Sequence, residues 1–198
     1  MMGKKLKIAL VVGHRKSNQG AYGSVGVSEY EFGRHFVHEL FNLVKHIRGG
    51  VEFKMFYRRD AKGYRANMRE LHERIDAWGA DLDIEFHFNA SSNKAASGHE
   101  VLYASKKGKK YAKMLNDRYA EYLPYLKDRG IKKRRKGRGS YGLKIGKSAS
   151  LIVEPFFASH QHMFIKNIKK REDLLNSYID MFSDLLYKHA DKKLKKVS

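Results

Sequence analysis

Hydrophobic residues follow two spacings along the chain, and the places where the spacing changes predict strands followed by helices. Short apolar or alternating runs, which are typical of strands, occupy residues 6–12, 51–57, 82–88, 100–104 and 150–153. Apolar residues at intervals of three and four, which are typical of amphipathic helices, occupy residues 28–48, 64–78, 109–123 and 173–189. This order predicts an α/β domain of three layers, in which helices flank a twisted, mostly parallel central sheet.

The first predicted helix begins with a capping signal. Ser28 is followed three residues later by Glu31, which is the sequence pattern of a capping box. Glu29 therefore lies in the first helical turn, where the positive end of the helix dipole favours an ionised carboxylate. The preceding loop, residues 15–27, contains three glycines, so its backbone can turn tightly and approach a ligand.

Two histidines follow predicted strands at the end where open α/β sheets carry their chemistry. His14 comes just past the strand of residues 6–12, and His87 lies at the end of the strand of residues 82–88. With Glu29 they supply two imidazoles and one carboxylate, a common ligand set of catalytic zinc that leaves a position open for water. The simpler alternative is that each is a hydrogen-bonded polar residue at the end of an element.

Glu154 leaves another predicted strand and supplies a second carboxylate. A glutamate that does not bind the metal can accept the proton of a zinc-bound water, whose pKa falls from about 15.7 to about 7. Apolar residues precede and follow Glu154, and such surroundings raise the pKa of a carboxyl group. The alternative is a structural acid paired with an arginine.

Composition narrows the possible partners and excludes thiol chemistry. The 41 lysines and arginines exceed the 21 acidic residues, giving a formal charge of +20, which predicts an acidic partner such as nucleic acid, an anionic membrane or an anionic cell-wall polymer. Residues 132–138 form the most basic run, which is expected to be a mobile loop. The chain has no cysteine, so disulfides, thiolate zinc sites and a cysteine nucleophile are excluded.

Four short segments, in this order along the chain, resemble the zinc-dependent N-acetylmuramoyl-L-alanine amidases. They are residues 11–14 (VVGH), 28–29 (SE), 86–90 (FHFNA) and 151–157 (LIVEPFF). The resemblance extends from Leu6 to about Tyr187 and implies the fold predicted above. It also implies an activity, the hydrolysis of the amide between N-acetylmuramic acid and L-alanine in peptidoglycan, with Zn²⁺ as the cofactor.

The resemblance implies a role for each candidate residue. His14, Glu29 and His87 would be the zinc ligands, and Glu154 would be the catalytic glutamate. Asn89 is predicted from its own position, just after the strand that carries His87, to hydrogen-bond the substrate, and the alternative is a plain turn residue. The chain departs from the usual family pattern at positions that have a serine, a glycine and an asparagine in the family. These positions are Glu85, Phe156 and His160, and none of them is a predicted ligand.

The remaining histidines are weaker candidates. His160 and His162 follow Glu154 closely and are predicted to border the site. His35 and His38 share one face of the first helix, but no third ligand accompanies them, so we expect surface residues.

No linker divides the chain, so we predict a single zinc amidase catalytic domain over residues 1–190, followed by a basic tail, residues 191–198. Lys7 interrupts the first apolar run, so no export signal is predicted. A basic domain of this kind resembles a phage endolysin, which is made in the cytoplasm and acts on the cell wall after release.

Peptidoglycan is the expected substrate, and the run 132–138 and the tail are expected to contact an anionic envelope or membrane surface. No specific nucleic acid is expected as a partner. Two alternatives stay open at this point. One is a basic nucleic-acid-binding protein or metal nuclease, and the other is a zinc peptidase that cuts another cell-wall amide.

Overall fold

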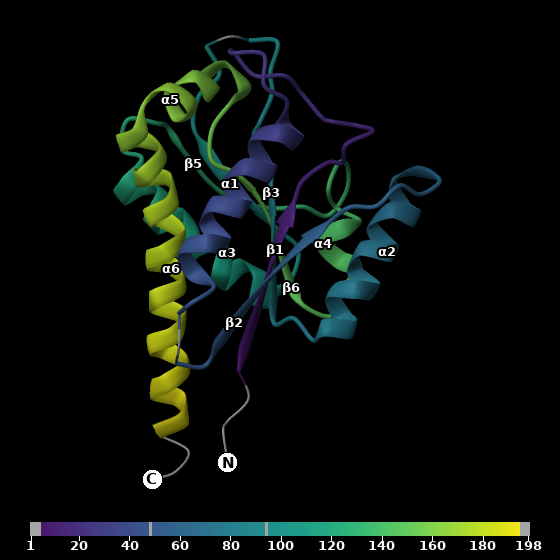
Figure 1. Cartoon of the computed structure of the whole chain (residues 1–198), viewed down its shortest axis with the longest axis vertical. Coiled ribbons are helices and arrows are strands. Elements are labelled where there is room, and N and C mark those ends of the chain that lie inside the picture. Colours follow the sequence, from purple (N-terminus) through teal and green to yellow (C-terminus); the bar gives the residue numbers. More distant parts are fainter. Residues whose placement is uncertain (1–4, 48, 94, 195–198) are drawn as a thin grey trace.

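A computed structural model describes residues 5–47, 49–93 and 95–194, and its strands form one sheet between two layers of helices (Figure 1). The strands are β1 (Leu6–Val12), β2 (Val51–Tyr57), β3 (Leu82–Phe86), β4 (His99–Tyr103), β5 (Asp128–Lys133) and β6 (Ala149–Glu154). Their order across the sheet is β2-β1-β3-β6-β4-β5. Every neighbouring pair is parallel except β4 and β6, which confirms the predicted mostly parallel sheet.

Helices cover both faces of the sheet. They are α1 (Glu29–Val44), α2 (Gly63–Trp78), α3 (Lys106–Tyr122), α4 (Gly142–Ile145), α5 (Gln161–Lys166) and α6 (Ile168–Leu194), with a 3₁₀ turn, η1 (Ala158–His160), before α5. In Figure 1, α1, α3 and α6 lie on one side of the sheet, and α2 and α4 lie on the other. This arrangement confirms the three predicted layers.

Residues of β1 pack into both layers, which explains why this strand reads as an uninterrupted apolar run. Ile8 and Leu10 belong to the large core shared with α1, α3 and α6, whereas Ala9 and Val11 belong to the smaller core beneath α2. A strand buried on both faces needs apolar side chains at consecutive positions.

The charged side chains of β3 are buried as well. Leu82, Ile84 and Phe86 enter the large core, while Asp83 and Glu85 point to the opposite face, and all five residues are buried. Alternation along a strand would normally indicate one solvated face. Here the second face is covered, so these two carboxylates require partners within the protein.

Several predicted boundaries differ from the structure. The strand predicted over 82–88 ends at Phe86, so His87 lies just past it. The helix predicted from 109 begins at Lys106, because the Ser105 side chain caps it by accepting a hydrogen bond from the Gly108 amide. The last helix begins at Ile168 rather than 173, and α4, η1 and α5 were not predicted.

The basic run 132–138 is only partly a loop, so the prediction of a mobile loop is wrong for its first residues. Residues 128–133 form β5, which pairs in parallel with β4 at the edge of the sheet. Ile131 packs against the core, whereas its charged neighbours are exposed to differing degrees. Composition suggested a loop because an edge strand leaves one border of its backbone and many side chains in solvent, where lysine and arginine are tolerated.

The C-terminal helix continues past the predicted domain boundary. Helix α6 ends at Leu194, so residues 191–194 of the predicted tail are helical, and residues 195–198 lie outside the described residues. The division into a domain over 1–190 and a tail over 191–198 stays a prediction. Within the described ranges, none of the helices is both long and apolar enough to cross a bilayer.

Candidate active site

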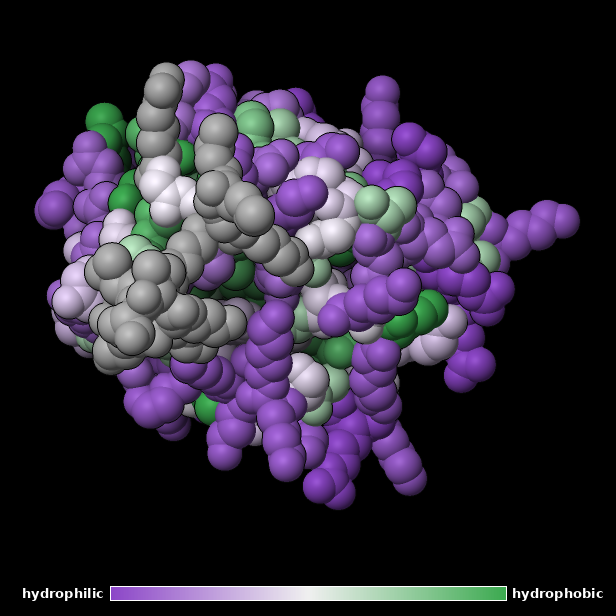
Figure 2. All heavy atoms as spheres, turned by 90° about the horizontal axis from the view of Figure 1, so that it is seen from below, coloured by the Kyte–Doolittle hydropathy of each residue, from purple (hydrophilic) through white to green (hydrophobic). Residues whose placement is uncertain are grey.

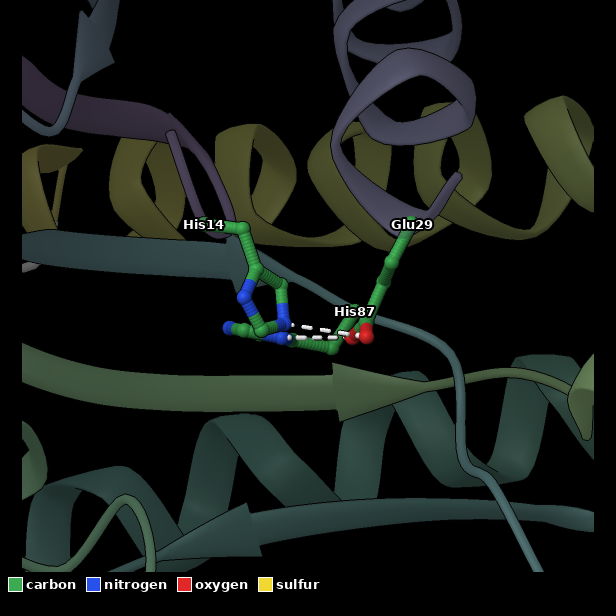
Figure 3. Close-up of side chains that lie close together, drawn as sticks. All are labelled: His14, Glu29 and His87. Atoms are coloured by element: carbon green, nitrogen blue, oxygen red, sulfur yellow. Dashed lines mark hydrogen bonds and ion pairs between the residues drawn. The ribbon is translucent and has the colours of Figure 1, made fainter. Parts of the chain in front are cut away.

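The three predicted metal ligands converge at the carboxyl ends of β1 and β3, beside the first turn of α1 (Figure 3). The Nε2 atom of His14 lies 2.9 Å from Oε2 of Glu29, and the Nδ1 atom of His87 lies 2.7 Å from Oε1 of the same carboxylate. One potential ligand atom from each residue lies within 4.8 Å of the others. The structure therefore brings together side chains that are up to 73 positions apart in the sequence, from His14 to His87.

His14 reaches the site through an unusual backbone conformation. Its φ is +61°, and it is the only residue other than glycine with a positive φ in the described ranges. This conformation costs free energy for a side chain with a Cβ atom, and such outliers concentrate at functional sites. The turn directs the imidazole from the end of β1 to the carboxylate of Glu29.

Glu29 is held at the start of α1 by the predicted capping box, which is confirmed. The Ser28 hydroxyl accepts a hydrogen bond from the Glu31 amide, and the Glu31 carboxylate accepts one from the Ser28 amide. The Glu29 carboxylate also accepts hydrogen bonds from the backbone amides of Ala21 and Phe88. These contacts fix its orientation between the two histidines.

His87 is fixed by the pairing of neighbouring strands just beyond β3. Its backbone amide donates to the carbonyl of Val153 at 3.0 Å, which continues the β3–β6 ladder by one residue. A Cβ atom at Gly13 would lie 2.8 Å from the His87 ring, so only glycine fits at the end of β1 here.

The electrostatics of the cluster favour a cation among the three side chains. Burial by itself would raise the pKa of Glu29, but hydrogen bonds from His14 and His87 outweigh burial and lower that pKa from 4.5 to about 2. Burial would lower the pKa of His87, but the hydrogen-bonded carboxylate of Glu29 and the nearby carboxylate of Glu85 outweigh burial and raise that pKa to about 9. Two buried carboxylates thus favour a positive charge at this position.

The donor set fits a transition metal such as zinc. Two imidazole nitrogens and one carboxylate oxygen suit Zn²⁺ better than the oxygen-only sets preferred by Mg²⁺ or Ca²⁺. The space is tight, because a Cβ atom at Gly20 would lie 2.6 Å from both Glu29 Oε2 and His14 Nε2. The glycine loop therefore closes against the candidate metal centre, as its composition predicted.

Residues after β6 hold this loop in place. Gln161 is fully buried, donates to the carbonyl of Val27 at 2.9 Å and packs against Gly23. Its neighbour His162 contacts the Ser24 hydroxyl through Nδ1 at 3.2 Å. His162 is not part of the ligand cluster, and its predicted position at the border of the site stays a prediction.

Glu154 lies at the end of β6, next to β3 in the sheet. The Asn89 amide, two residues beyond His87, donates a hydrogen bond of 2.8 Å to Oε2 of Glu154. Burial, together with the nearby carboxylate of Glu100, raises the pKa of Glu154 to about 7, and the charges of His87 and Glu29 also act on it. Glu154 therefore lies close enough to the cluster to feel its charges, and it can change protonation state near neutral pH.

Glu100 is a neighbour of Glu154 that the sequence analysis did not single out. The two glutamates are opposite each other in the antiparallel pair of β4 and β6. Glu100 is itself buried and accepts hydrogen bonds from Arg129 Nε and Lys132 Nζ, both of β5, at 2.5 Å. Part of the basic run thus neutralises a buried carboxylate behind the candidate catalytic residue.

The other histidines lie outside the cluster. His35 and His38 are exposed on α1, as predicted, with His38 hydrogen-bonded to the Tyr57 hydroxyl and His35 beside Arg34. His160 contacts the hydroxyl of Ser159 at 3.0 Å.

Together, the parallel sheet, the His-Glu-His cluster at its carboxyl end and the adjacent glutamate define an α/β domain with a candidate metal-assisted hydrolytic site. A family model described as N-acetylmuramoyl-L-alanine amidase matches residues 8–179 of the sequence. This chain therefore belongs to the N-acetylmuramoyl-L-alanine amidase family, and the resemblance seen in the sequence is confirmed. No curated protein matches the chain significantly.

Solved structures share the fold along nearly their whole length. The catalytic domain of the N-acetylmuramoyl-L-alanine amidase CwlV from Bacillus (Paenibacillus) polymyxa var. colistinus is 16% identical, with a TM-score of 0.75 over 91% of this chain and 98% of that one. The CwlD amidase from Clostridioides difficile, solved in complex with the GerS lipoprotein, is 18% identical, with a TM-score of 0.76 over 92% and 99%. The catalytic domain of the endolysin CD27L, described as targeting Clostridia Difficile, is 27% identical, with a TM-score of 0.66 over 86% and 97%.

Proposed function

We propose that this protein is a zinc-dependent hydrolase that cleaves the amide between N-acetylmuramic acid and L-alanine in peptidoglycan. The observation that carries the proposal is the convergence of His14, Glu29 and His87 at one end of the sheet, with Glu154 beside them. Membership of the amidase family supports the choice of substrate.

His14 through Nε2, Glu29 through its carboxylate and His87 through Nδ1 would hold the zinc ion. Zinc in such a site polarises a carbonyl oxygen and lowers the pKa of a bound water to about 7. The two histidines come from neighbouring strand ends and the glutamate from a helix start. These rigid elements position the ligands before substrate binds.

Glu154 would accept a proton from the attacking water and return it to the nitrogen of the departing L-alanine. A group that does both works best when its pKa lies near the working pH, and the pKa of Glu154 is raised to about 7. Asn89 donates a hydrogen bond to one oxygen of Glu154 and so fixes the orientation of the carboxyl group. A direct contact between Asn89 and substrate stays a prediction.

The test is a zymogram on purified peptidoglycan, with and without a chelator, followed by mass analysis of the released fragments. We expect clearing that the chelator abolishes and added zinc restores, together with new L-alanine amino termini and free lactyl carboxyl groups on muramic acid. Cleavage at another amide would indicate a cell-wall peptidase. Salt-dependent retardation of duplex DNA without any clearing would indicate the nucleic-acid alternative instead.

We also propose an endolysin-like role, in which the protein is made in the cytoplasm and reaches the wall after release. Support comes from the likeness to the CD27L catalytic domain and from the basic composition. Figure 2 shows the lower end of the molecule in Figure 1, and outside the grey atoms most of the side chains visible there are hydrophilic. We propose that the basic run 132–138 and the C-terminal residues contact anionic envelope polymers or membrane surfaces.

Removing residues 190–198 tests the contribution of the C-terminal end. Activity on isolated peptidoglycan is expected to stay within about twofold of the full chain, because α6 ends far from the carboxyl ends of β1 and β3, where the candidate site lies (Figure 1). Lysis of whole cells is expected to weaken, and more so at low ionic strength, where electrostatic attraction matters most. An equal loss in both assays would contradict the surface role and indicate that these residues support folding.

A further inference from the structure

The second ring nitrogen of His87 faces a buried carboxylate that belongs to the same strand end. Nδ1 of His87 points to Glu29, and the other nitrogen lies on the side away from Glu29 (Figure 3). That nitrogen, Nε2, is 3.4 Å from Oε1 of Glu85. The Glu85 side chain is only 5% exposed, so it is held inside the protein beside the metal centre.

Arg58 holds this carboxylate in place. Arg58 lies just after β2, and its Nη2 atom forms an ion pair with Oε1 of Glu85. The guanidinium also lies 5.7 Å from the centre of the Tyr64 ring on α2. A buried carboxylate is tolerated when a cation neutralises it, so Arg58 explains how Glu85 can occupy this position.

Apart from the ion-pair contacts described above, three buried atoms of this group have no hydrogen-bond partner in the part of the chain that the structure describes. Nε2 of His87, Oε1 of Glu85 and Nε of Arg58 are all buried, and none makes a conventional hydrogen bond within the described structure. An imidazole that gives Nδ1 to a metal must carry its proton on Nε2. That N–H then points at Glu85, the acceptor within reach.

We propose that Glu85, held by Arg58, is a positioning residue that fixes the tautomer and ring orientation of His87 and thereby tightens metal binding. A carboxylate that accepts the second N–H of a histidine ligand orients the ring and makes the ligating nitrogen more basic. The inference rests on the proposed zinc site.

The test compares zinc affinities of purified full-length variants by competition with a chromophoric chelator. Glu85→Gln keeps the size of the side chain and removes its charge, and we expect its zinc affinity to fall by about 10- to 100-fold. Glu85→Asp keeps the charge at a greater distance, and we expect an intermediate loss. Because Glu85→Asp retains the ion-pair partner of Arg58, it keeps the comparison informative if Glu85→Gln does not fold.

Asp83→Asn is the matched control. Asp83 is a buried carboxylate two residues earlier on the same face of β3, and its partners are the hydroxyls of Ser148 and Ser150 rather than a ligand. We expect this variant to bind zinc within about twofold of the original chain, even if its thermal stability changes. A merely structural role for Glu85 would lower stability without a selective loss of zinc affinity.

The possible results distinguish a failure of the proposed role of Glu85 from a failure of the proposed metal site. If the unaltered chain binds zinc tightly and both Glu85 variants match it, the role of Glu85 is wrong and the metal site stands. If the unaltered chain has no measurable zinc affinity, the proposed metal site fails and the role of Glu85 fails with it. A loss confined to the Glu85 variants supports the inference.

Discussion

Replacing Glu154 by glutamine is expected to lower kcat on peptidoglycan by about 10²-fold or more, while the fold and the zinc content stay unchanged. Glutamine has the same shape and can keep the hydrogen bond from Asn89, but it cannot accept a proton. The measurement is the rate of release of new L-alanine amino termini at saturating substrate, with zinc per chain determined on the same sample.

A matched control for this variant is Glu70→Gln, which removes a half-buried carboxylate of α2 that pairs with Arg74. Its turnover is expected to equal that of the original chain. Near-normal turnover of Glu154→Gln would remove Glu154 from the catalytic mechanism.

The same variant should change how activity depends on pH. Glu154 must be ionised to accept a proton, so activity of the original chain is expected to rise with pH and level off above the pKa of Glu154. That pKa is raised to about 7 by burial and by Glu100, and a cation among the three ligands would lower it, so the midpoint is expected at or below pH 7. The residual activity of Glu154→Gln should lack this acidic limb.

The raised pKa of Glu154 also predicts how the stability of the metal-free protein depends on pH. The folded-state pKa of Glu154 lies above its ordinary value of 4.5, so the folded state binds this proton more tightly than the unfolded chain does. The stabilisation is complete below pH 4.5 and is lost as the pH rises through about 7. Glu154→Gln is therefore expected to unfold at a higher temperature than the original chain at pH 8, after treatment with a chelator.

Replacing His87 by alanine is expected to abolish zinc binding, so that zinc per chain falls from about one to near zero after dialysis. The change removes one of three ligands and leaves Glu29 and Glu85 with less positive charge between them. Activity on peptidoglycan should be lost together with the metal, and added zinc should not restore it.

His38→Ala is the corresponding control on a histidine. His38 is exposed on α1, hydrogen-bonds the Tyr57 hydroxyl and is not part of the ligand cluster. Its zinc content and activity should match those of the original chain. Full zinc retention by His87→Ala would contradict the proposed ligand set.

The main strands and helices were predictable because the local sequence pattern and the tertiary packing favour the same structure in them. The run 6–12 is apolar at consecutive positions because β1 is covered on both faces. The start of α1 was predictable because capping is decided within four residues, from Ser28 to Glu31. β5 was missed because its lysines and arginines match a loop in composition, and only its pairing with β4 makes it a strand.

The candidate ligands were predictable for a similar reason. His14, Glu29 and His87 each lie next to the end of a recognisable element, and parallel strands bring such ends to one edge of a sheet. The backbone conformation of His14, with its positive φ, has no signal in the sequence because histidine seldom adopts it.

By itself, the sequence determined the alternation of strands and helices, the cap of α1 and the identity of the four candidate site residues. Only the tertiary structure decided the surroundings of those residues. Glu100 meets Glu154 through the antiparallel pairing of β4 and β6, and Arg58, just after β2, meets Glu85 of β3 although β1 lies between these two strands in the sheet. The reason is physical: periodicity and capping depend on neighbours within a few residues, whereas the pKa of a buried carboxylate depends on charges that distant segments place beside it.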